Sequence, residues 1–376
     1  MKAVRHILLI FLTLMIFSCE DNNSYILEGK IKKLQSHELY IISEGSLRID
    51  TIKAKFGLFS KTGRFTYKNT SQTAEPLLIK MENDKVWVTV WVENGEKIIL
   101  KGDANYPELI LAKGGKINKL LTKFKTENFS LIKEKCELRD KMIARTENHE
   151  ELNASNDSHL LFQIKNVDQI LKTQAQNFVE HNPSSIAALV LIQDYILDIE
   201  NASNIQPFLD ILPEEVKANY LYEKLKMLSF KDLQTKVNQP ALDFSIRNIK
   251  NDTISLDTFK DKYLILTFAT SQCEFCVPDF TELINIKNTF SEKDLAILTV
   301  SLDESKENWK DFANQHEITW TQVIDSVGWD SEIASLYNVL SLPCHYLIDN
   351  KGIIIGSKLQ VDSIQTILTE KLSKNE

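Results

Sequence analysis

The stretch of sequence that decides the fold of the C-terminal part begins with YLILTF, residues 263–268, and leads into CEFC, residues 273–276. The first run is apolar apart from one threonine, which predicts a buried strand. The two cysteines stand where helical periodicity begins, and we expect a helix from about residue 273 to residue 290. A strand that leads into such a cysteine pair indicates a site of dithiol–disulfide exchange.

The start of a helix favours reactivity at Cys273. Free backbone N–H groups and the positive end of the helix dipole stabilise a thiolate there, and the thiolate is the nucleophile. Cys276 stands three positions later, on nearly the same helical face. We therefore expect Cys273 to attack a substrate disulfide and Cys276 to resolve the mixed disulfide. The reverse sequence of steps would oxidise a dithiol.

A proline stands at the entrance to a second strand-like run. Residues 341–343 read SLP, and residues 345–348 read HYLI. We expect the Leu342–Pro343 bond to be cis, because the backbone before a cis proline can lie open beside the reactive sulfur and pair with a substrate strand. Leu342 and Pro343 are therefore predicted substrate-binding residues. Cys344 follows directly, and it is a candidate accessory thiol if its side chain faces Cys273.

The chain divides into segments of different periodicity. Residues 25–112 contain short apolar or alternating runs between turn residues, which predicts an all-β domain. Within it, residues 87–92 alternate as a half-exposed strand does. Residues 115–235 have apolar residues at helical spacing and are predicted to form a helical connector. Residues 236–376 alternate strand-like and helical segments, which predicts a central sheet covered on both faces.

The N-terminus has the pattern of a secretory leader. Lys2 and Arg5 precede an apolar run over residues 7–17, which is too short to cross a bilayer as a helix. Cys19 follows a small residue, and this resembles a bacterial lipoprotein cleavage site, in which the cysteine carries the lipid. An ordinary signal peptide that ends near a cysteine is the alternative.

Residues 1–19 are thus predicted to be a lipoprotein signal peptide with its lipidation site. The mature protein should be held at a membrane surface by acyl chains at Cys19. We expect it on the extracytoplasmic side of the cell envelope, periplasmic or at the outer membrane, where disulfides persist.

The composition restricts the remaining function classes. The chain of 376 residues is 43% hydrophobic and 26% charged, which is normal for two or three globular domains. Its net charge of −8 argues against nucleic-acid binding. A single CxxC pair lacks the other ligands of a zinc site, so no metal is expected. Cys136 lies in a helical stretch and is interpreted as a small buried hydrophobic residue.

Residues 236–376 resemble the TlpA/ResA group of envelope thiol–disulfide oxidoreductases, within the AhpC/TSA–redoxin superfamily of thioredoxin-like proteins. The resemblance is carried by Pro240, Asp243, Phe244, Leu256, Phe259, Lys262, Tyr263, Phe268, Ala269, Cys273, Cys276, Tyr337, Asn338, Val339, Pro343, Leu347, Ile348, Asp349 and Gly352. The whole layout resembles lipoproteins in which a β-rich domain of unknown function and a helical segment precede such a domain.

The resemblance implies an α/β thioredoxin-like C-terminal domain preceded by an all-β N-terminal domain and a helical connector. It implies that the Cys273–Cys276 disulfide is the redox centre and that no other cofactor is needed. It also implies that protein cysteines are the substrates and that a membrane-linked electron donor keeps the pair reduced. The expected activity is that of a reductase or isomerase, with reduction as the expected direction.

The chain departs from the family pattern around the cysteines. Gln272 stands where the family usually has tryptophan, and Asp279 and Thr281 stand where it has glutamate and proline. Pro278 is unusual in the first turns of the helix and could distort it. Thr267 occupies the place of a buried aspartate in thioredoxins, so no carboxylate proton shuttle is predicted.

Two other functions stay open at this point. TSQC, residues 270–273, has the TxxC spacing of a peroxide-reducing cysteine, which would make the protein a peroxiredoxin-like peroxide reductase. The upstream proline of such sites is absent from residues 264–269, however. The other alternative is a surface lipoprotein that binds a ligand through its β-rich domain and carries a vestigial redox module. The missing tryptophan and Pro278 favour this reading slightly.

Overall fold

The computed structural model describes residues 23–43, 48–58, 60–81, 86–147, 154–248 and 252–372. Two compact units divide the chain, Met1–Leu191 and Ile192–Glu376. The predicted leader and Cys19 lie outside the described residues. Within the described ranges, no helix is both long and apolar enough to cross a membrane.

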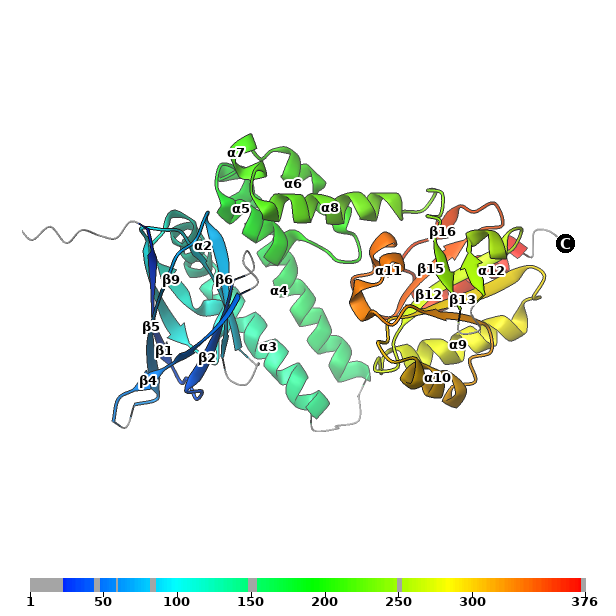
Figure 1. Cartoon of the computed structure of the whole chain (residues 1–376), viewed down its shortest axis with the longest axis horizontal. Helices are drawn as coiled ribbons and strands as arrows, with labels where there is room; N and C mark the ends of the chain where they lie inside the picture. The colour runs from blue at the N-terminus through cyan, green and yellow to red at the C-terminus, as the bar shows by residue number, and fades with distance from the viewer. Residues whose placement is uncertain are drawn as a thin grey trace, which may run out of the picture. The chain divides into compact units, whose positions relative to one another are not determined.

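Two β-sheets form the first part of the first unit, as the sequence predicts (Figure 1). The larger sheet has the strand order β4 (Lys55–Phe56), β5 (Thr62–Asn69), β1 (Tyr25–Lys32), β8 (Lys97–Asp103) and β9 (Leu111–Lys113). The smaller sheet has the order β3 (Arg48–Lys53), β2 (Glu38–Ser43), β6 (Glu75–Met81) and β7 (Val86–Val92). Alternate residues of both sheets, among them Leu27, Ile79 and Leu100, share one apolar core.

Strand β7 departs from the half-exposed pattern that its sequence predicts. Trp87 is 42% exposed, but Trp91 is only 2% exposed. The reason is the helix α2 (Lys116–Glu127), which contacts β7. Asn118 of this helix donates to the Trp91 carbonyl at 2.7 Å and accepts from the Trp91 amide at 3.1 Å. The predicted alternation is therefore wrong at Trp91, because a helix covers it.

The helical region runs from the end of the first unit into the second. In the first unit, η1 (Pro107–Leu109) and α2 precede α3 (Phe129–Glu147), α4 (Ala154–His181) and α5 (Ile186–Leu191). In the second unit follow η2 (Ile192–Ile196), η3 (Ala202–Ile205), α6 (Gln206–Asp210), α7 (Glu214–Lys217) and α8 (Tyr220–Gln234). Cys136 is buried in α3, and burial raises the pKa of its thiol to about 11, which agrees with a structural role.

A five-stranded sheet forms the centre of the second unit. Its strands lie in the order β14 (Thr321–Ile324), β13 (Leu295–Ser301), β12 (Tyr263–Ala269), β15 (Cys344–Ile348) and β16 (Ile354–Gly356). β13 runs parallel to both β12 and β14, whereas β15 is antiparallel to its neighbours β12 and β16. A separate hairpin, β10 (Ser245–Arg247) and β11 (Thr253–Ser255), precedes it.

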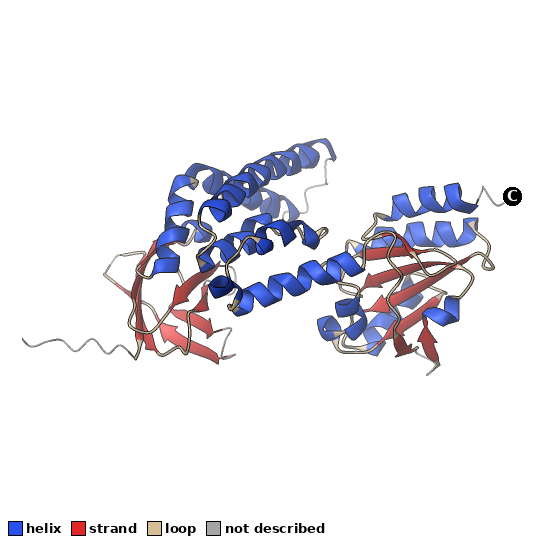
Figure 2. Ribbon diagram, turned by 90° about the horizontal axis from the view of Figure 1, so that it is seen from above, coloured by secondary structure: helices blue, strands red, loops and turns tan. Residues whose placement is uncertain are grey.

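Helices cover both faces of this sheet (Figure 2). They are α9 (Cys276–Thr289), α10 (Lys306–Gln315), α11 (Glu332–Leu336) and α12 (Val361–Leu372), with the short turns η4 (Leu256–Phe259) and η5 (Gly328–Asp330). Ile265 of β12 packs in the core that α9, α10 and α12 share, which we call the α9 core. Its neighbours Leu264 and Leu266 pack in the opposite core with α11, the α11 core. The predicted fold class is confirmed.

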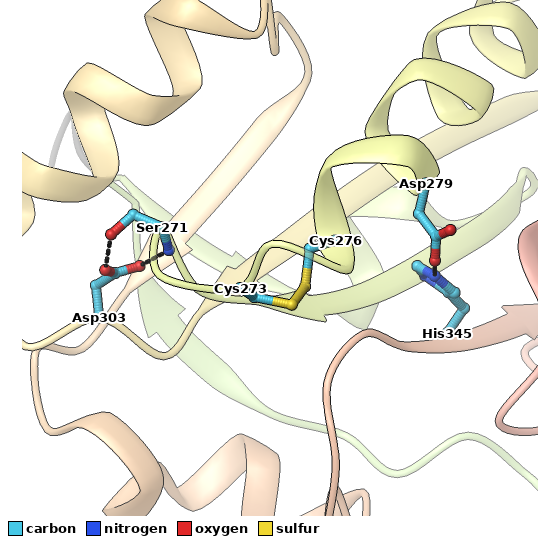
Figure 3. The surroundings of a disulfide bond; sticks show 6 residues. All are labelled: Ser271, Cys273, Cys276, Asp279, Asp303 and His345. Atoms are coloured by element: carbon cyan, nitrogen blue, oxygen red, sulfur yellow. Dashed lines mark hydrogen bonds and ion pairs between the residues drawn. A yellow bond between two sulfur atoms is a disulfide. The ribbon is translucent and has the colours of Figure 1, made fainter. Parts of the chain in front are cut away.

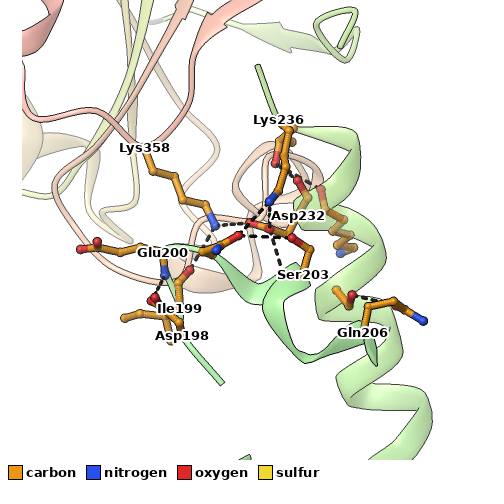
Figure 4. A network of polar contacts seen from close by, with 12 residues as sticks. Asp198, Ile199, Glu200, Ser203, Gln206, Asp232, Lys236 and Lys358 are labelled. Atoms are coloured by element: carbon orange, nitrogen blue, oxygen red, sulfur yellow. Dashed lines mark hydrogen bonds and ion pairs between the residues drawn. The ribbon is translucent and has the colours of Figure 1, made fainter. Parts of the chain in front are cut away.

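A buried ion pair fastens α8 to the segment after β16 (Figure 4). The Lys358 ammonium donates to the Asp232 carboxylate at 2.9 Å and to the Ile199 carbonyl at 3.1 Å. The second Asp232 oxygen accepts from the Ser203 amide at 3.0 Å, and Lys236 lies 3.8 Å from it. The side chains of Asp232 and Lys358 are only 4% and 10% exposed. The buried Lys358–Asp232 ion pair thus connects helix α8 to the sheet-containing part of this unit.

Candidate active site

Cys273 and Cys276 form a disulfide after strand β12 (Figure 3). Their Cα atoms are 5.3 Å apart. Cys273 is partly exposed, whereas Cys276 is 1% exposed and belongs to the α9 core. The two sulfurs therefore differ in access, because an external reactant can approach Cys273 but not Cys276.

The helix begins at Cys276 and not at Cys273, contrary to the sequence-based expectation. Cys273 lies in the preceding turn, where its amide donates to the Thr270 carbonyl at 3.1 Å and its carbonyl accepts from the Cys276 amide at 3.0 Å. Pro278 occupies the third position of α9. A backbone N–H at the third helical position has no hydrogen-bond partner within the helix, so a proline at this position removes no bond. The helix therefore continues undisturbed to Thr289.

Asp303 anchors the loop before the cysteines. Its carboxylate accepts from the Ser271 amide at 2.9 Å and from the Ser271 hydroxyl, and it accepts from the Ser301 hydroxyl at 2.8 Å (Figure 3). Asp303 is 5% exposed and stands two residues after the end of β13. Sequence reasoning missed it, because Asp303 and Ser271 are 32 positions apart.

The Leu342–Pro343 peptide bond is cis, as expected. Phe268, near the end of β12, pairs with Cys344 at the beginning of β15. Since the two strands are antiparallel, Pro343 enters the sheet at the edge where β12 leaves it toward Cys273. Leu342 and Pro343 are both partly exposed. The fold thus brings the predicted proline loop to the same sheet edge as the disulfide.

The structure does not bring Cys344 to the disulfide. Successive side chains of a strand point to opposite faces. Cys344 packs in the α11 core with Phe268 and Tyr337, whereas Cys273 and Cys276 belong to the α9 core. Burial raises the pKa of the Cys344 thiol to about 12. The condition for an accessory role, a side chain that faces Cys273, is not met.

A buried histidine lies on the same side of the sheet as Cys276. His345 is 2% exposed, and its Nε2 lies 2.8 Å from Oδ2 of Asp279 (Figure 3). Asp279 stands three residues after Cys276 on α9. His345 pairs across the sheet with Thr267, whose hydroxyl is buried and has no hydrogen-bond partner among the described residues. Sequence reasoning noted Asp279 and Thr267 separately but not His345.

Among the described residues, no group of three or more His, Cys, Asp and Glu side chains is arranged to hold a metal ion. Phe275, between the two cysteines, is 80% exposed and presents an aromatic ring beside the disulfide. The arrangement can therefore carry out thiol–disulfide exchange with its own sulfur atoms.

Comparisons with known proteins agree with this geometry. The model of the AhpC/TSA family matches residues 237–357. Thioredoxin-like protein YneN of Bacillus subtilis is 29% identical over 129 residues, which are 34% of this chain and 73% of that protein. Thiol-disulfide oxidoreductase ResA of Bacillus thuringiensis is 26% identical over 144 residues, which are 38% of this chain and 81% of that protein.

A solved thiol-disulfide oxidoreductase from Bacteroides fragilis is 30% identical, and the match covers 35% of this chain and 98% of that chain with a TM-score of 0.34. The family match, the relatives and the disulfide together define the class. The C-terminal part of the chain is a thioredoxin-like domain of the AhpC/TSA family. More closely, it is a thiol–disulfide oxidoreductase domain of the ResA/TlpA kind, with Cys273 and Cys276 as its CxxC disulfide.

Proposed function

We propose that the protein is an envelope thiol–disulfide oxidoreductase that reduces disulfides of substrate proteins. The observation that carries the proposal is the unequal access of the two bonded sulfurs, with Cys273 partly exposed and Cys276 buried. An accessible first nucleophile and a protected second one favour exchange with a protein partner. Leu342 and Pro343, at the same sheet edge, are the proposed residues against which a substrate strand pairs.

The reaction has two steps in the reducing direction. The Cys273 thiolate attacks one sulfur of the substrate disulfide, forms a mixed disulfide and releases the other substrate sulfur as a thiolate. Cys276 then loses its proton and attacks Cys273, which re-forms the intramolecular disulfide and releases the second substrate thiolate. Two electrons pass to the substrate, whose sulfurs take up two protons. A membrane-linked donor is the proposed source of the next two electrons.

Reduction of insulin by the purified protein with dithiothreitol as electron source tests the proposal. We expect activity in the wild type, and none above the dithiothreitol background in Cys273→Ser. Cys276→Ser should instead accumulate a mixed disulfide with the substrate, which non-reducing electrophoresis and mass spectrometry detect. Equal insulin reduction by wild type and Cys273→Ser would overturn the proposal and favour a ligand-binding lipoprotein.

A peroxide assay separates exchange from peroxide reduction. The protein, reduced and then freed of dithiothreitol, is mixed with hydrogen peroxide alone. Because a second cysteine stands close enough to Cys273 to bond with it, which fits exchange better than peroxide reduction, we expect slow peroxide consumption and fast reaction with insulin. Fast peroxide consumption with no insulin reduction would instead identify a peroxide reductase.

The direction of electron flow is decided by the equilibrium potential of the Cys273–Cys276 pair. Equilibration with glutathione at defined ratios, followed by alkylation, measures it. A potential more negative than that of the glutathione pool supports a reductase. A strongly oxidising potential would make the protein an oxidase of substrate thiols.

The lipid anchor and the location are proposed on the pattern of residues 1–19. Metabolic labelling with a fatty acid should mark the wild type and not Cys19→Ala, and cell fractionation should move Cys19→Ala from the membrane to the soluble extracytoplasmic fraction. Labelling that persists in Cys19→Ala would contradict this site of lipidation.

A further inference from the structure

His345 is a buried base on the α9 side of the sheet, and the exchange mechanism above does not use it. Strand β15 turns its side chain toward the α9 core, the same side of the sheet as Cys276. Figure 3 shows the ring next to Asp279, on the side of Cys276 that faces away from Ser271 and Asp303. The Nδ1 atom of the ring is buried and has no hydrogen-bond partner among the described residues.

The bond to Asp279 settles which ring nitrogen can accept a proton. An ionised carboxylate only accepts hydrogen bonds, so the Nε2 that lies 2.8 Å from Oδ2 carries the hydrogen. In the neutral imidazole, Nδ1 then holds a free lone pair. The pair thus presents an unused proton acceptor inside an otherwise apolar core.

We propose that His345, held by Asp279, accepts at Nδ1 the proton that the Cys276 thiol must lose during resolution. This inference rests on the proposed exchange function. Cys276 and Asp279 are three residues apart on α9, and residues at this spacing are neighbours on one helix face. Since Cys276 is 1% exposed, water has little access to its proton. Asp279 is 21% exposed and gives the pair a route to solvent.

The step balances without an external reactant. The S–H bond of Cys276 breaks, its proton goes to His345, and the resulting thiolate attacks the Cys273 sulfur of the mixed disulfide. The bond between Cys273 and the substrate sulfur breaks, and that sulfur leaves with the electron pair as a thiolate. The imidazolium then returns its proton to solvent by way of Asp279, and the leaving thiolate takes one up.

The elements packed together on this side of the sheet carry the following charged groups. Helix α9 carries Asp279 itself, Glu282 and, in its last turn, Lys287, and helix α12, which contacts α9, carries Asp362 in its first turn. Strand β12 contributes only the neutral Thr267. The segment after β16 hydrogen-bonds to the His345 carbonyl through the Leu359 amide, but the ammonium of Lys358 in that segment is paired with Asp232.

The two steps of exchange can be followed separately with Ellman's reagent. The reduced full-length protein releases one coloured thiolate when Cys273 reacts and a second when Cys276 resolves the mixed disulfide. We expect the second rate in the wild type to rise with pH, because only the neutral imidazole accepts a proton. Cys273→Ser gives the background from other thiols.

His345→Gln is the matched variant, because its amide can still donate to Asp279 but cannot take up a proton. We expect the second step to slow at least about tenfold at neutral pH and to lose its dependence on pH, while the first step keeps its rate. An unchanged second rate with the wild-type pH profile would overturn the proposal and leave His345 a structural tie between α9 and β15.

Asp279→Asn tests the pair without changing the histidine, and it serves if His345→Gln does not fold. Removal of the negative neighbour disfavours the imidazolium, so the second step should slow while the first step keeps its rate. A second rate equal to that of the wild type would also overturn the proposal. If the wild type releases no thiolate in the first step, the proposed function itself fails, which is a different result.

Discussion

The Ser271 amide donates a 2.9 Å hydrogen bond to the buried carboxylate of Asp303, and the Ser271 hydroxyl donates to the same group. This contact joins the loop before the cysteines to the end of the neighbouring strand β13. The Leu302 amide adds a bond of 2.8 Å to the Ala269 carbonyl, one step closer to the sheet. The position of Cys273 therefore depends on a carboxylate in the segment that follows another strand.

Asp303→Ala should destabilise the protein and slow exchange. The change leaves the Ser271 amide and the Ser301 hydroxyl without their acceptor, and each unsatisfied buried group costs about 1–3 kcal/mol. Urea unfolding and insulin reduction measure the two effects. Ser271→Ala is the control, with a smaller loss of about 1 kcal/mol, because the amide keeps its acceptor. Equal stability of Asp303→Ala and wild type would contradict this role.

Cys344 should be unreactive in the folded protein. Burial raises the pKa of its thiol to about 12, so at pH 8 it stays protonated, and a thiol is a poor nucleophile. Iodoacetamide should label Cys344 only after denaturation, whereas Cys273 in the reduced protein should react at once. Cys344→Ala should keep wild-type insulin reduction. Rapid labelling of Cys344 in the native protein, read out by peptide mass spectrometry, would count against its place in the α11 core.

Removal of Asp232 should cost several kcal/mol. Asp232→Asn leaves the Lys358 ammonium buried without its counter-charge, and breaking a buried pair in this way costs about 3–5 kcal/mol. The double variant Asp232→Leu with Lys358→Met should recover most of that loss, because no charge then stays buried. Urea unfolding of the two variants at neutral pH is the measurement. A double variant no more stable than the single one would argue against this account.

The Asp232 carboxylate should make the free energy of unfolding depend on pH in the acid range. Burial raises the pKa of Asp232, but hydrogen bonds from Lys358 and the Ser203 amide outweigh it, so the pKa lies below its ordinary value. The pair therefore stabilises the fold fully above the unfolded pKa of about 4, and this stabilisation is lost as the pH falls through the lower folded value. Unfolding free energies measured from pH 6 downward should fall more steeply in the wild type than in Asp232→Asn.

Phe275 should affect substrate recognition more than stability. Its ring is 80% exposed beside the disulfide, so Phe275→Ala should change the free energy of unfolding by less than about 0.5 kcal/mol. Loss of an aromatic contact of about 1 kcal/mol would lower kcat/KM for insulin by about fivefold. Reaction with Ellman's reagent should be unchanged. Phe230→Ala, at an exposed position of α8, is the matched control and should change neither.

The sequence predicts the strands of the second unit well, because their apolar runs are continuous. The predicted strand at residues 263–268 is one residue shorter than β12, and the cis proline is where the pattern places it. The sequence predicts the helix start at Cys273, whereas α9 begins at Cys276. Residues 273–276 form a turn in which the Cys276 amide donates to the Cys273 carbonyl, and the residue types of such a turn are the same as those of a first helical turn.

Polar partners that are distant in the chain could not be predicted from the sequence. His345 is 66 positions from Asp279, and only the register of β15 against β12 turns its side chain toward α9. The same register turns Cys344 the other way. All five residues of β15 are buried, because helices cover both faces of the sheet. The strand therefore shows no alternation of apolar and polar residues that would predict which side chains point toward α9.

The Lys358–Asp232 contact also decides where the chain can be cut. A fragment that starts at residue 236 keeps the lysine and discards its carboxylate, together with the Ile199 carbonyl that shares the ammonium. Expression of the redox domain alone should therefore begin near residue 192. A fragment that begins after α8 would contain the Lys358 ammonium without a counter-charge. Water or an anion from the solution would then have to contact this ammonium in place of Asp232.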